Sequence, residues 1–237
     1  MIARKIGRWP SVTMLLICLV LVKPTLALSQ SAASSNPSDD LVNQASTVAA
    51  YTIDASLLPS VSSQAADDFV VPSNVFWHIN HASVVGNNVG TTGPGIDRIL
   101  VQFYTDSGAG LPSKLIYSQI IASSGYSITS IGTYNFNLNP QLVLGPGHYW
   151  FSMQPHVISC PDNSCRQWLW IESLESPGPN QAESAWQGSW VSDCKTWQLR
   201  VTVCGRPSTS TGKDLAFQLQ GVTVPVVAQI NLPLISR

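Results

Sequence analysis

Charged residues are scarce in this chain. They make up 11% of its 237 residues, whereas roughly a quarter is usual for a soluble domain, so the surface has to rely on Ser, Thr, Asn and Gln. Beyond position 28 the chain has eight basic residues against 13 acidic ones, a formal charge of −5. This balance excludes a phosphate-binding surface as the default, and we therefore expect no nucleic-acid partner.

Sequence motifs of catalysis are also missing. The chain contains no G-x-S-x-G elbow, no P-loop, no G-x-G-x-x-G between a strand and a helix, and no EF-hand loop. His78 and His81 lie in a segment with the pattern of a strand, where a spacing of three puts them on opposite faces and disfavours a joint metal site. The sequence therefore predicts a protein that is not an enzyme. A secreted hydrolase that uses Glu172 or Glu183 stays open, because a glycosidase needs two carboxylates across a cleft.

The first 28 residues have the layout of a secretory signal peptide. Three basic residues between positions 4 and 8 precede an apolar run of 11 residues, Val12–Val22, and Thr25-Leu26-Ala27 offers a small-x-small cleavage site. The apolar run is shorter than the ~20 residues that span a bilayer, which makes a retained anchor helix the weaker alternative. We expect residues 1–28 to act as the signal peptide and the mature protein to be secreted or held at the cell surface.

Four cysteines remain after such a cleavage: Cys160, Cys165, Cys194 and Cys204. An even number of cysteines in an exported chain indicates disulfides, and three connectivities are open. We expect the pairs Cys160–Cys165 and Cys194–Cys204, each of which closes a short local loop. The competing interpretation is a four-thiolate zinc site, but the chain lacks the paired C-x-x-C spacing of such sites.

The mature chain divides into three parts. Residues 29–64 form a polar leader, rich in Ser, Ala, Asn and Gln, that is either partly disordered or supplies an edge strand. Residues 65–221 form the domain. The tail, residues 222–237, is apolar but broken by Pro225 and Pro233. It is too short to span a membrane, so we expect no transmembrane segment in the mature chain.

Alternation with a period of two is the main structural signal in the domain. The clearest run is Tyr126–Leu138, where mostly apolar residues at even positions alternate with mostly polar ones at odd positions, and Ile99–Phe103 and Trp197–Val203 behave similarly. Clusters of Gly, Pro, Ser and Asp separate these runs, and no helical pattern is convincing. The sequence predicts an all-β fold, a two-sheet antiparallel β-sandwich that is jelly-roll-like, with roughly nine or ten strands.

Three segments of the domain form a recognisable layout. They are Gln64–Pro72 (QAADDFVVP), which leads into a strand with Trp77, then Leu144–Trp150 (LGPGHYW), and finally Lys213–Gly221 (KDLAFQLQG). This layout resembles a broad group of exported bacterial β-sandwich modules that are often found near surface-anchoring signals. The resemblance covers residues 65–221. It implies a β-sandwich and an extracellular or surface location, and it brings no shared catalytic residues to this chain.

Tryptophan is concentrated in one part of the chain, with six of the eight residues between positions 150 and 197. Trp168 and Trp170 share one face of an expected strand, and Trp186 and Trp190 share one as well. Indole rings stack on sugar rings or anchor protein contacts, so these four are our candidate ligand-binding residues. The competing interpretation is that they fill the core between two sheets.

Asp67 and Asp68, together with Asp97 or Asp106, are the candidates for a calcium site. Calcium takes six to eight oxygen ligands from carboxylates and loop carbonyls, and exported sandwiches offer both. The alternative is that Asp67 and Asp68 accept backbone N–H bonds at a turn. No other cofactor is indicated.

The sequence as a whole predicts an exported, non-catalytic β-sandwich interaction module of the cell surface or extracellular space. Its partner is not specified by the sequence, and a glycan or a surface protein would each suit such a module. The alternative is a carbohydrate-binding module that uses the clustered tryptophans, and the second alternative is the secreted hydrolase.

Overall fold

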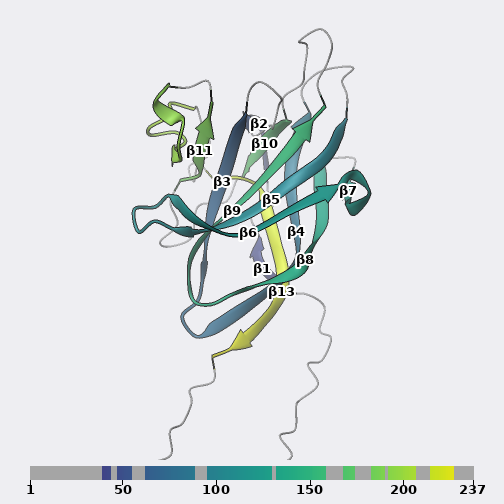
Figure 1. The fold of residues 1–237 in the computed structure, drawn as a ribbon, viewed down its shortest axis with the longest axis vertical. Coiled ribbons are helices and arrows are strands. Elements are labelled where there is room, and N and C mark those ends of the chain that lie inside the picture. Colours follow the sequence, from purple (N-terminus) through teal and green to yellow (C-terminus); the bar gives the residue numbers. More distant parts are fainter. Residues whose placement is uncertain are drawn as a thin grey trace, which may run out of the picture. The chain divides into compact units, whose positions relative to one another are not determined.

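The structure is a computed structural model that describes residues 39–43, 47–54, 62–88, 95–129, 132–158, 168–173, 183–189, 192–206 and 214–226. These residues form thirteen strands and two short 3-10 helices, η1 (Ser123–Gly125) and η2 (Ser192–Cys194) (Figure 1). Every strand pairing is antiparallel. No helix within these ranges is long and apolar enough to cross a bilayer.

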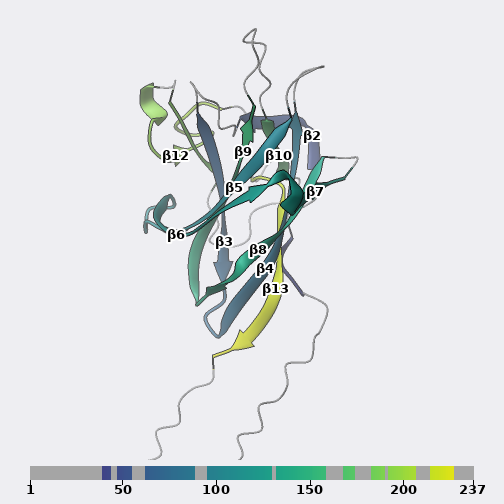
Figure 2. The same cartoon turned by 45° about the vertical axis from the view of Figure 1, so that its right-hand side comes forward.

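The strands form two sheets (Figures 1 and 2). The seven-stranded sheet has the order β1-β13-β4-β10-β2, with β8 also paired to β4 and β7 paired to β8. Its strands are β1 (Asp39–Asn43), β2 (Thr47–Asp54), β4 (Val75–Asn88), β7 (Tyr126–Ile128), β8 (Thr133–Leu144), β10 (Trp168–Ser173) and β13 (Phe217–Pro225). The six-stranded sheet has the order β12-β11-β3-β9-β5-β6. Its strands are β3 (Ser63–Val71), β5 (Ile96–Asp106), β6 (Pro112–Ala122), β9 (Gly147–Val157), β11 (Ala185–Gly188) and β12 (Gln198–Leu199).

This architecture confirms the predicted all-β, two-sheet antiparallel sandwich. The strand count is higher than the nine or ten expected, because the described residues contain thirteen strands. Two of the additional strands, β1 and β2, come from the polar leader and stand at the two ends of the strand order of their sheet. Two others, β7 and β12, have only three and two residues, too few to show an alternation in the sequence.

The core between the two sheets is largely aromatic. The ring of Phe151 on β9 lies 5.2 Å from that of Phe217 on β13 and 5.8 Å from that of Trp170 on β10. Trp168 meets Tyr134 of β8 edge to face, with ring centroids 5.8 Å apart. All five rings are buried. Each such ring removes 150–250 Å² from water, which contributes several kcal/mol at roughly 25 cal/mol per Å².

β3 is the strand that is covered on both faces, since eight of its nine residues are buried. Its inward residues, such as Ala65 and Phe69, belong to the main core. Ala66, on the other face, belongs to a second cluster with Tyr104, Trp150 and Ala185, against which Leu111 and Trp197 pack. The outer face of the six-stranded sheet is therefore covered in part by a smaller core of its own.

β4 contains a β-bulge between Ile79 and His81, where it has one residue more than its partner β13 between Gly221 and Gln220. Ile79 before the bulge and Ala82 after it are both buried in the main core, so the extra residue changes which positions face inward. His78 and His81 consequently project from the same, outer face, and the expectation that they lie on opposite faces is wrong. Gly221 of β13 permits the bulge, because a Cβ there would lie 2.0 Å from the carbonyl oxygen of His78.

The run Tyr126–Leu138 is divided between two strands, although its alternation is continuous. β7 ends at Ile128 and β8 begins at Thr133, and the two pair as a hairpin in which Tyr126 lies opposite Phe136. The turn is closed by a hydrogen bond from Thr129 N to Thr133 O at 2.9 Å, and Gly132 has a φ of +83°. Glycine adopts this left-handed conformation without steric cost, and it therefore allows the chain to reverse.

We predict that Gly86→Ala destabilises the fold. Gly86 lies on β4, and a Cβ there would be 2.0 Å from the indole ring of Trp168, which is fully buried and cannot move aside. Overpacking of this kind costs about 1–3 kcal/mol, to be measured by chemical denaturation. The matched control is Gly95→Ala, because a Cβ at that exposed glycine has no heavy atom within 4 Å. Equal stability of the two variants would contradict the packing described around Trp168.

Candidate functional site

A polar pocket of about 240 Å³ lies where β3, β9 and β11 adjoin the segment that follows η2. Inward positions of β3 hold core residues such as Ala65, so the alternate position Gln64 projects to the outer face of the sheet. The pocket is lined by Ser62, Ser63, Gln64, Gln154, Gln187, Gly188, Ser189 and Lys195. Its side chains therefore offer carboxamides, hydroxyls and one ammonium group.

Hydrogen bonds fix the orientation of two of the three amides. The carbonyl oxygen of Ala65 can only accept, and it accepts from Ser152 Oγ at 2.7 Å. The Ser152 oxygen in turn accepts from Gln64 Nε2 at 3.0 Å. The carbonyl oxygen of Gln64 then accepts from Gln187 Nε2 at 2.9 Å. This chain of bonds leaves the carbonyl oxygen of Gln187 without a protein partner among the described residues.

The third amide, that of Gln154, is oriented independently. Its Nε2 donates to the backbone carbonyl of Ser63 at 2.5 Å and to Ser62 Oγ at 3.0 Å. Because a carbonyl only accepts, the nitrogen has to be the atom on that side. The Gln154 carbonyl oxygen is therefore the other atom of the amide, and within the described part of the chain it has no partner either.

The serines of the pocket are held through their backbones. Ser189 N donates to Ser62 O at 2.9 Å, and Ser62 N donates to Ser189 Oγ at 3.1 Å. The Ser189 hydroxyl oxygen accepts in the second of these contacts, and the Ser62 hydroxyl oxygen accepts from Gln154 Nε2, so each hydroxyl keeps its own proton for a further bond.

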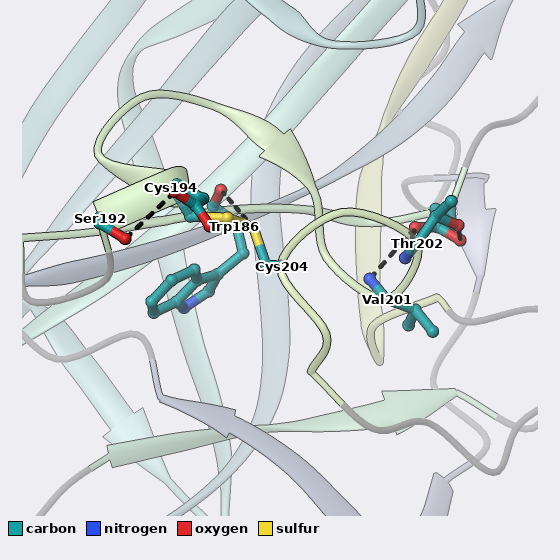
Figure 3. The surroundings of a disulfide bond; sticks show 8 residues. Trp186, Ser192, Cys194, Val201, Thr202 and Cys204 are labelled. Carbon is teal, nitrogen blue, oxygen red and sulfur yellow. Dashed lines mark hydrogen bonds between the residues drawn. A yellow bond between two sulfur atoms is a disulfide. The ribbon is translucent and has the colours of Figure 1, made fainter.

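A disulfide holds the segment that carries Lys195 (Figure 3). Cys194 and Cys204 are bonded, with Cα atoms 6.0 Å apart and a separation of ten positions in the sequence, which confirms the predicted pair. Cysteines joined in this way are not thiolate ligands, so these two do not support the zinc interpretation. Cys160 and Cys165, the other predicted pair, lie outside the described residues.

Three of the four candidate tryptophans are in the interior. Trp168, Trp170 and Trp186 have no exposed surface, and the guanidinium of Arg206 lies over the ring of Trp186 at 4.3 Å. A ring without exposed surface cannot stack on a ligand. Their burial therefore corrects the expectation of an exposed platform and supports the competing interpretation that they fill the core. Trp190 lies outside the described residues.

A second polar group is buried inside the sandwich. It consists of Asp67, Glu172, Asp214 and Arg200, each at most 1% exposed, and is called the acidic cluster below. Arg200 Nη1 donates to Glu172 Oε1 at 2.5 Å. The backbone N–H of Leu215 donates to Asp67 Oδ2 at 2.7 Å. Three carboxyl groups thus share one buried guanidinium, which leaves an excess of acid.

The acidic cluster raises the pKa of two of its carboxyl groups. Burial raises the pKa of Asp67 well above its usual range, and the nearby charges of Asp214 and Asp68 add to this. The pKa of Asp214 rises to about 8, first because of burial and then because of the charge of Asp68, while Arg200 acts in the opposite direction. Asp214 therefore carries a proton at neutral pH. Both of its side-chain oxygens are buried and have no hydrogen-bond partner among the described residues.

Asp67 and Asp68 do not converge on one site. They are consecutive residues of β3, so their side chains leave the strand on opposite faces. Asp68 contacts His148 Nε2, whereas Asp67 binds the N–H of Leu215. No group of three or more His, Cys, Asp or Glu side chains is arranged to hold a metal ion in the ranges that the structure describes. The geometry of these residues does not support the calcium hypothesis.

The other two aspartates considered for calcium also have histidine neighbours. Asp97 Oδ1 lies 2.6 Å from His156 Nδ1. Asp106 Oδ1 lies 3.6 Å from His148 Nδ1 and accepts from Trp150 Nε1 at 2.8 Å. Both carboxylates therefore serve contacts between neighbouring strands.

The two glutamates of the hydrolase hypothesis serve the fold. Glu172 is paired with Arg200, as described above. Glu183 accepts from the backbone N–H groups of Val201 and Thr202 at 3.1 and 2.8 Å, and so caps the turn after β12. Neither glutamate lines the polar pocket.

Comparison with known proteins adds no assignment: no family model, no curated protein and no solved structure matches this chain. The polar pocket and the acidic cluster therefore have to be interpreted from their own chemistry.

We predict that Asp214→Asn stabilises the protein at pH 8 and not at pH 4. The folded state holds the Asp214 proton up to about pH 8, whereas the unfolded chain loses it near pH 4. Unfolding thus releases a proton between these values, and the free energy of unfolding falls as the pH rises through this window. The variant has no such proton to release. Its free energy of unfolding should therefore equal that of the wild type at pH 4 and exceed it by a few kcal/mol, on the order expected for such a pKa shift, near pH 8.

Denaturation curves across this pH range measure the effect. The control is Asp193→Asn, at an exposed acidic residue in η2, for which we expect a change below about 0.5 kcal/mol throughout. A loss of stability in Asp214→Asn that is constant from pH 4 to 8 would show that this carboxyl group does not hold a proton in the folded state.

Proposed function

We propose that this protein is an exported, non-catalytic β-sandwich module that binds a partner at the cell surface or in the extracellular space. The observation that carries the proposal is the composition of the polar pocket. The described residues that line it supply amides, hydroxyls and one ammonium group, and no carboxylate, imidazole or thiol is among them. Such a lining forms hydrogen bonds with a ligand, and its serine hydroxyls and its lysine are the groups in it that act in acid–base or nucleophilic chemistry elsewhere.

Serine and lysine together can form a nucleophile–base pair, which is the remaining route to catalysis in this pocket. That pair requires the lysine nitrogen within hydrogen-bonding reach of a serine oxygen. Lys195 makes no such bond to any described residue, and the hydroxyls of Ser62 and Ser189 are engaged with backbone and amide groups instead. The pocket therefore favours binding over reaction.

Export is supported by two independent features. The first is the signal-peptide pattern of residues 1–28. The second is the disulfide between Cys194 and Cys204, because such bonds form and persist in oxidising compartments outside the cytosol.

One observation favours a second candidate function, that of a hydrolase. Asp67 and Asp214 are two carboxyl groups whose pKa values are raised together, as in sites where two acids share a proton. Their exposure of at most 1% counts against this candidate, since a substrate cannot reach them in this structure. Structural ion-pair networks also perturb pKa values.

Export is tested by expressing the full chain with a C-terminal tag in a bacterial host. We expect the tagged protein outside the cytoplasm, with a mature N-terminus at or next to Leu28 by N-terminal sequencing. Replacing Leu15 and Leu16 with charged residues breaks the apolar run and should abolish export. Full-length protein that stays in the cytoplasm would count against the proposal.

The absence of catalysis is tested with the purified mature protein on panels of glycoside, ester and peptide substrates. We expect no turnover above that of a heat-denatured sample. Turnover that disappears in Asp214→Asn, a variant expected to fold, would establish the hydrolase instead.

A further inference from the structure

The polar pocket presents a defined pattern of hydrogen-bonding groups. Two carbonyl oxygens, those of Gln154 and Gln187, have no partner among the described residues, and the bonds that the two amide nitrogens donate fix which atom of each amide is the oxygen. Neither oxygen is among the buried atoms that lack a partner, so solvent reaches both. The hydroxyls of Ser62 and Ser189 can still donate, and Lys195 adds the donors of an ammonium group. The pocket thus offers a ligand two carbonyl oxygens that only accept hydrogen bonds, together with hydroxyl and ammonium groups that can donate them.

This pattern discriminates between charged ligands and neutral ones. An anion brings acceptors only, and it would meet the two amide oxygens without a hydrogen bond to offer them. A cation brings donors, but it would meet the ammonium group of Lys195, which has no acidic partner among the described residues. A hydroxyl group donates and accepts at once. A ligand with several hydroxyls therefore satisfies both halves of the lining.

The lining also argues for a sugar rather than a peptide. Peptides gain affinity by pairing with a strand edge or by placing side chains in apolar pockets. The described residues that line the pocket include no aliphatic or aromatic side chain, and the edge of β3 beside it is already paired with β11, from Ala66–Ala185 to Ser63–Gly188. The volume of about 240 Å³ is below the roughly 300–1,000 Å³ of sites for drug-sized ligands, so it suits one ring rather than a chain of rings.

We propose that this pocket binds a single neutral sugar residue, such as the end of a glycan, through Gln154, Gln187, Ser189 and Lys195. The inference rests on the proposed function, because it names the ligand class of the same pocket. Gln64 and Ser152 act as positioning residues. They turn the Gln187 amide so that its oxygen remains available.

The experiment is an NMR titration of the ¹⁵N-labelled mature protein. The probes are glucose, galactose, mannose and N-acetylglucosamine as neutral sugars, glucuronate and inorganic phosphate as anions, and a peptide of mixed sequence. At least one neutral sugar should shift the amide signals of Ser62–Gln64, Gln187–Ser189 and Lys195. It should bind at least tenfold more tightly than glucuronate, phosphate or the peptide.

The variants separate this pocket from other surfaces. Gln187→Ala combined with Lys195→Ala should weaken binding of the selected sugar at least tenfold. The matched controls are Gln141→Ala and Lys114→Ala, at exposed residues outside the pocket, and they should leave the affinity unchanged. If the double variant unfolds, Lys195→Ala alone, at an exposed residue, should still weaken binding about threefold or more.

Three results would overturn the inference: no binding of any neutral sugar, tighter binding of an anion or the peptide, or sugar binding that the pocket variants leave intact. These three results bear on the ligand alone and can be distinguished from results that would contradict the proposed function. An exported, catalytically silent protein that ignores sugars keeps its role as a module and loses only this ligand. Cytoplasmic retention or turnover would remove the role itself, whatever the titration shows.

Discussion

The burial of β3 on both faces is the constraint on which the rest of the structure depends. A strand in this position cannot leave its outward polar side chains to water, and an unpaired buried polar group costs about 1–3 kcal/mol. Gln64 and Asp68 therefore have to find partners on adjacent strands, which they do at Ser152 and His148 of β9. These bonds fix side-chain orientations on the outer face. The same constraint that stabilises the sandwich thus produces the polar pocket beside it.

The fold could be predicted from the sequence because alternation is a local property of each strand, and the spacing of Cys194 and Cys204 is equally local. The predictions from alternation were wrong where the chain turns or bulges within a run that alternates continuously in the sequence. The alternation of Tyr126–Leu138 passes through a hairpin, and a single bulged residue before His81 reverses the faces on which the remaining side chains of β4 lie. The sequence does not show that Gln64, Gln154 and Gln187 form one pocket, because they come together only through the lateral pairing of their strands. The alternation of each strand predicts that these polar residues lie at outward positions. It does not predict the register that brings the three of them side by side.

The tryptophans and the acidic cluster show that unusual composition and unusual pKa values do not by themselves define a functional site. Trp168 and Trp170 are concentrated in the sequence because β10 faces the inter-sheet core. Asp214 has a raised pKa because it is buried beside other acids, and a proton is the simplest way to neutralise it where one guanidinium serves several carboxyl groups. Whether solvent and ligands can reach a polar group decides whether it serves the fold or can serve a function. The acidic cluster is closed to solvent, whereas the amide oxygens of the pocket are not.

The disulfide connects the proposed extracellular location of the protein to the geometry of its pocket. Lys195 follows Cys194 directly, and the bond to Cys204 ties this residue to the turn that Glu183 caps. A disulfide that closes a loop of this length lowers the entropy of the unfolded chain, which raises the free energy of unfolding by roughly 3 kcal/mol or less. Its effect on global stability is therefore modest. Its local effect is larger, since without the bond the segment that carries the ammonium group has one fewer attachment to the core. The pocket is therefore best ordered in an oxidising compartment, which agrees with the export that we propose for this protein.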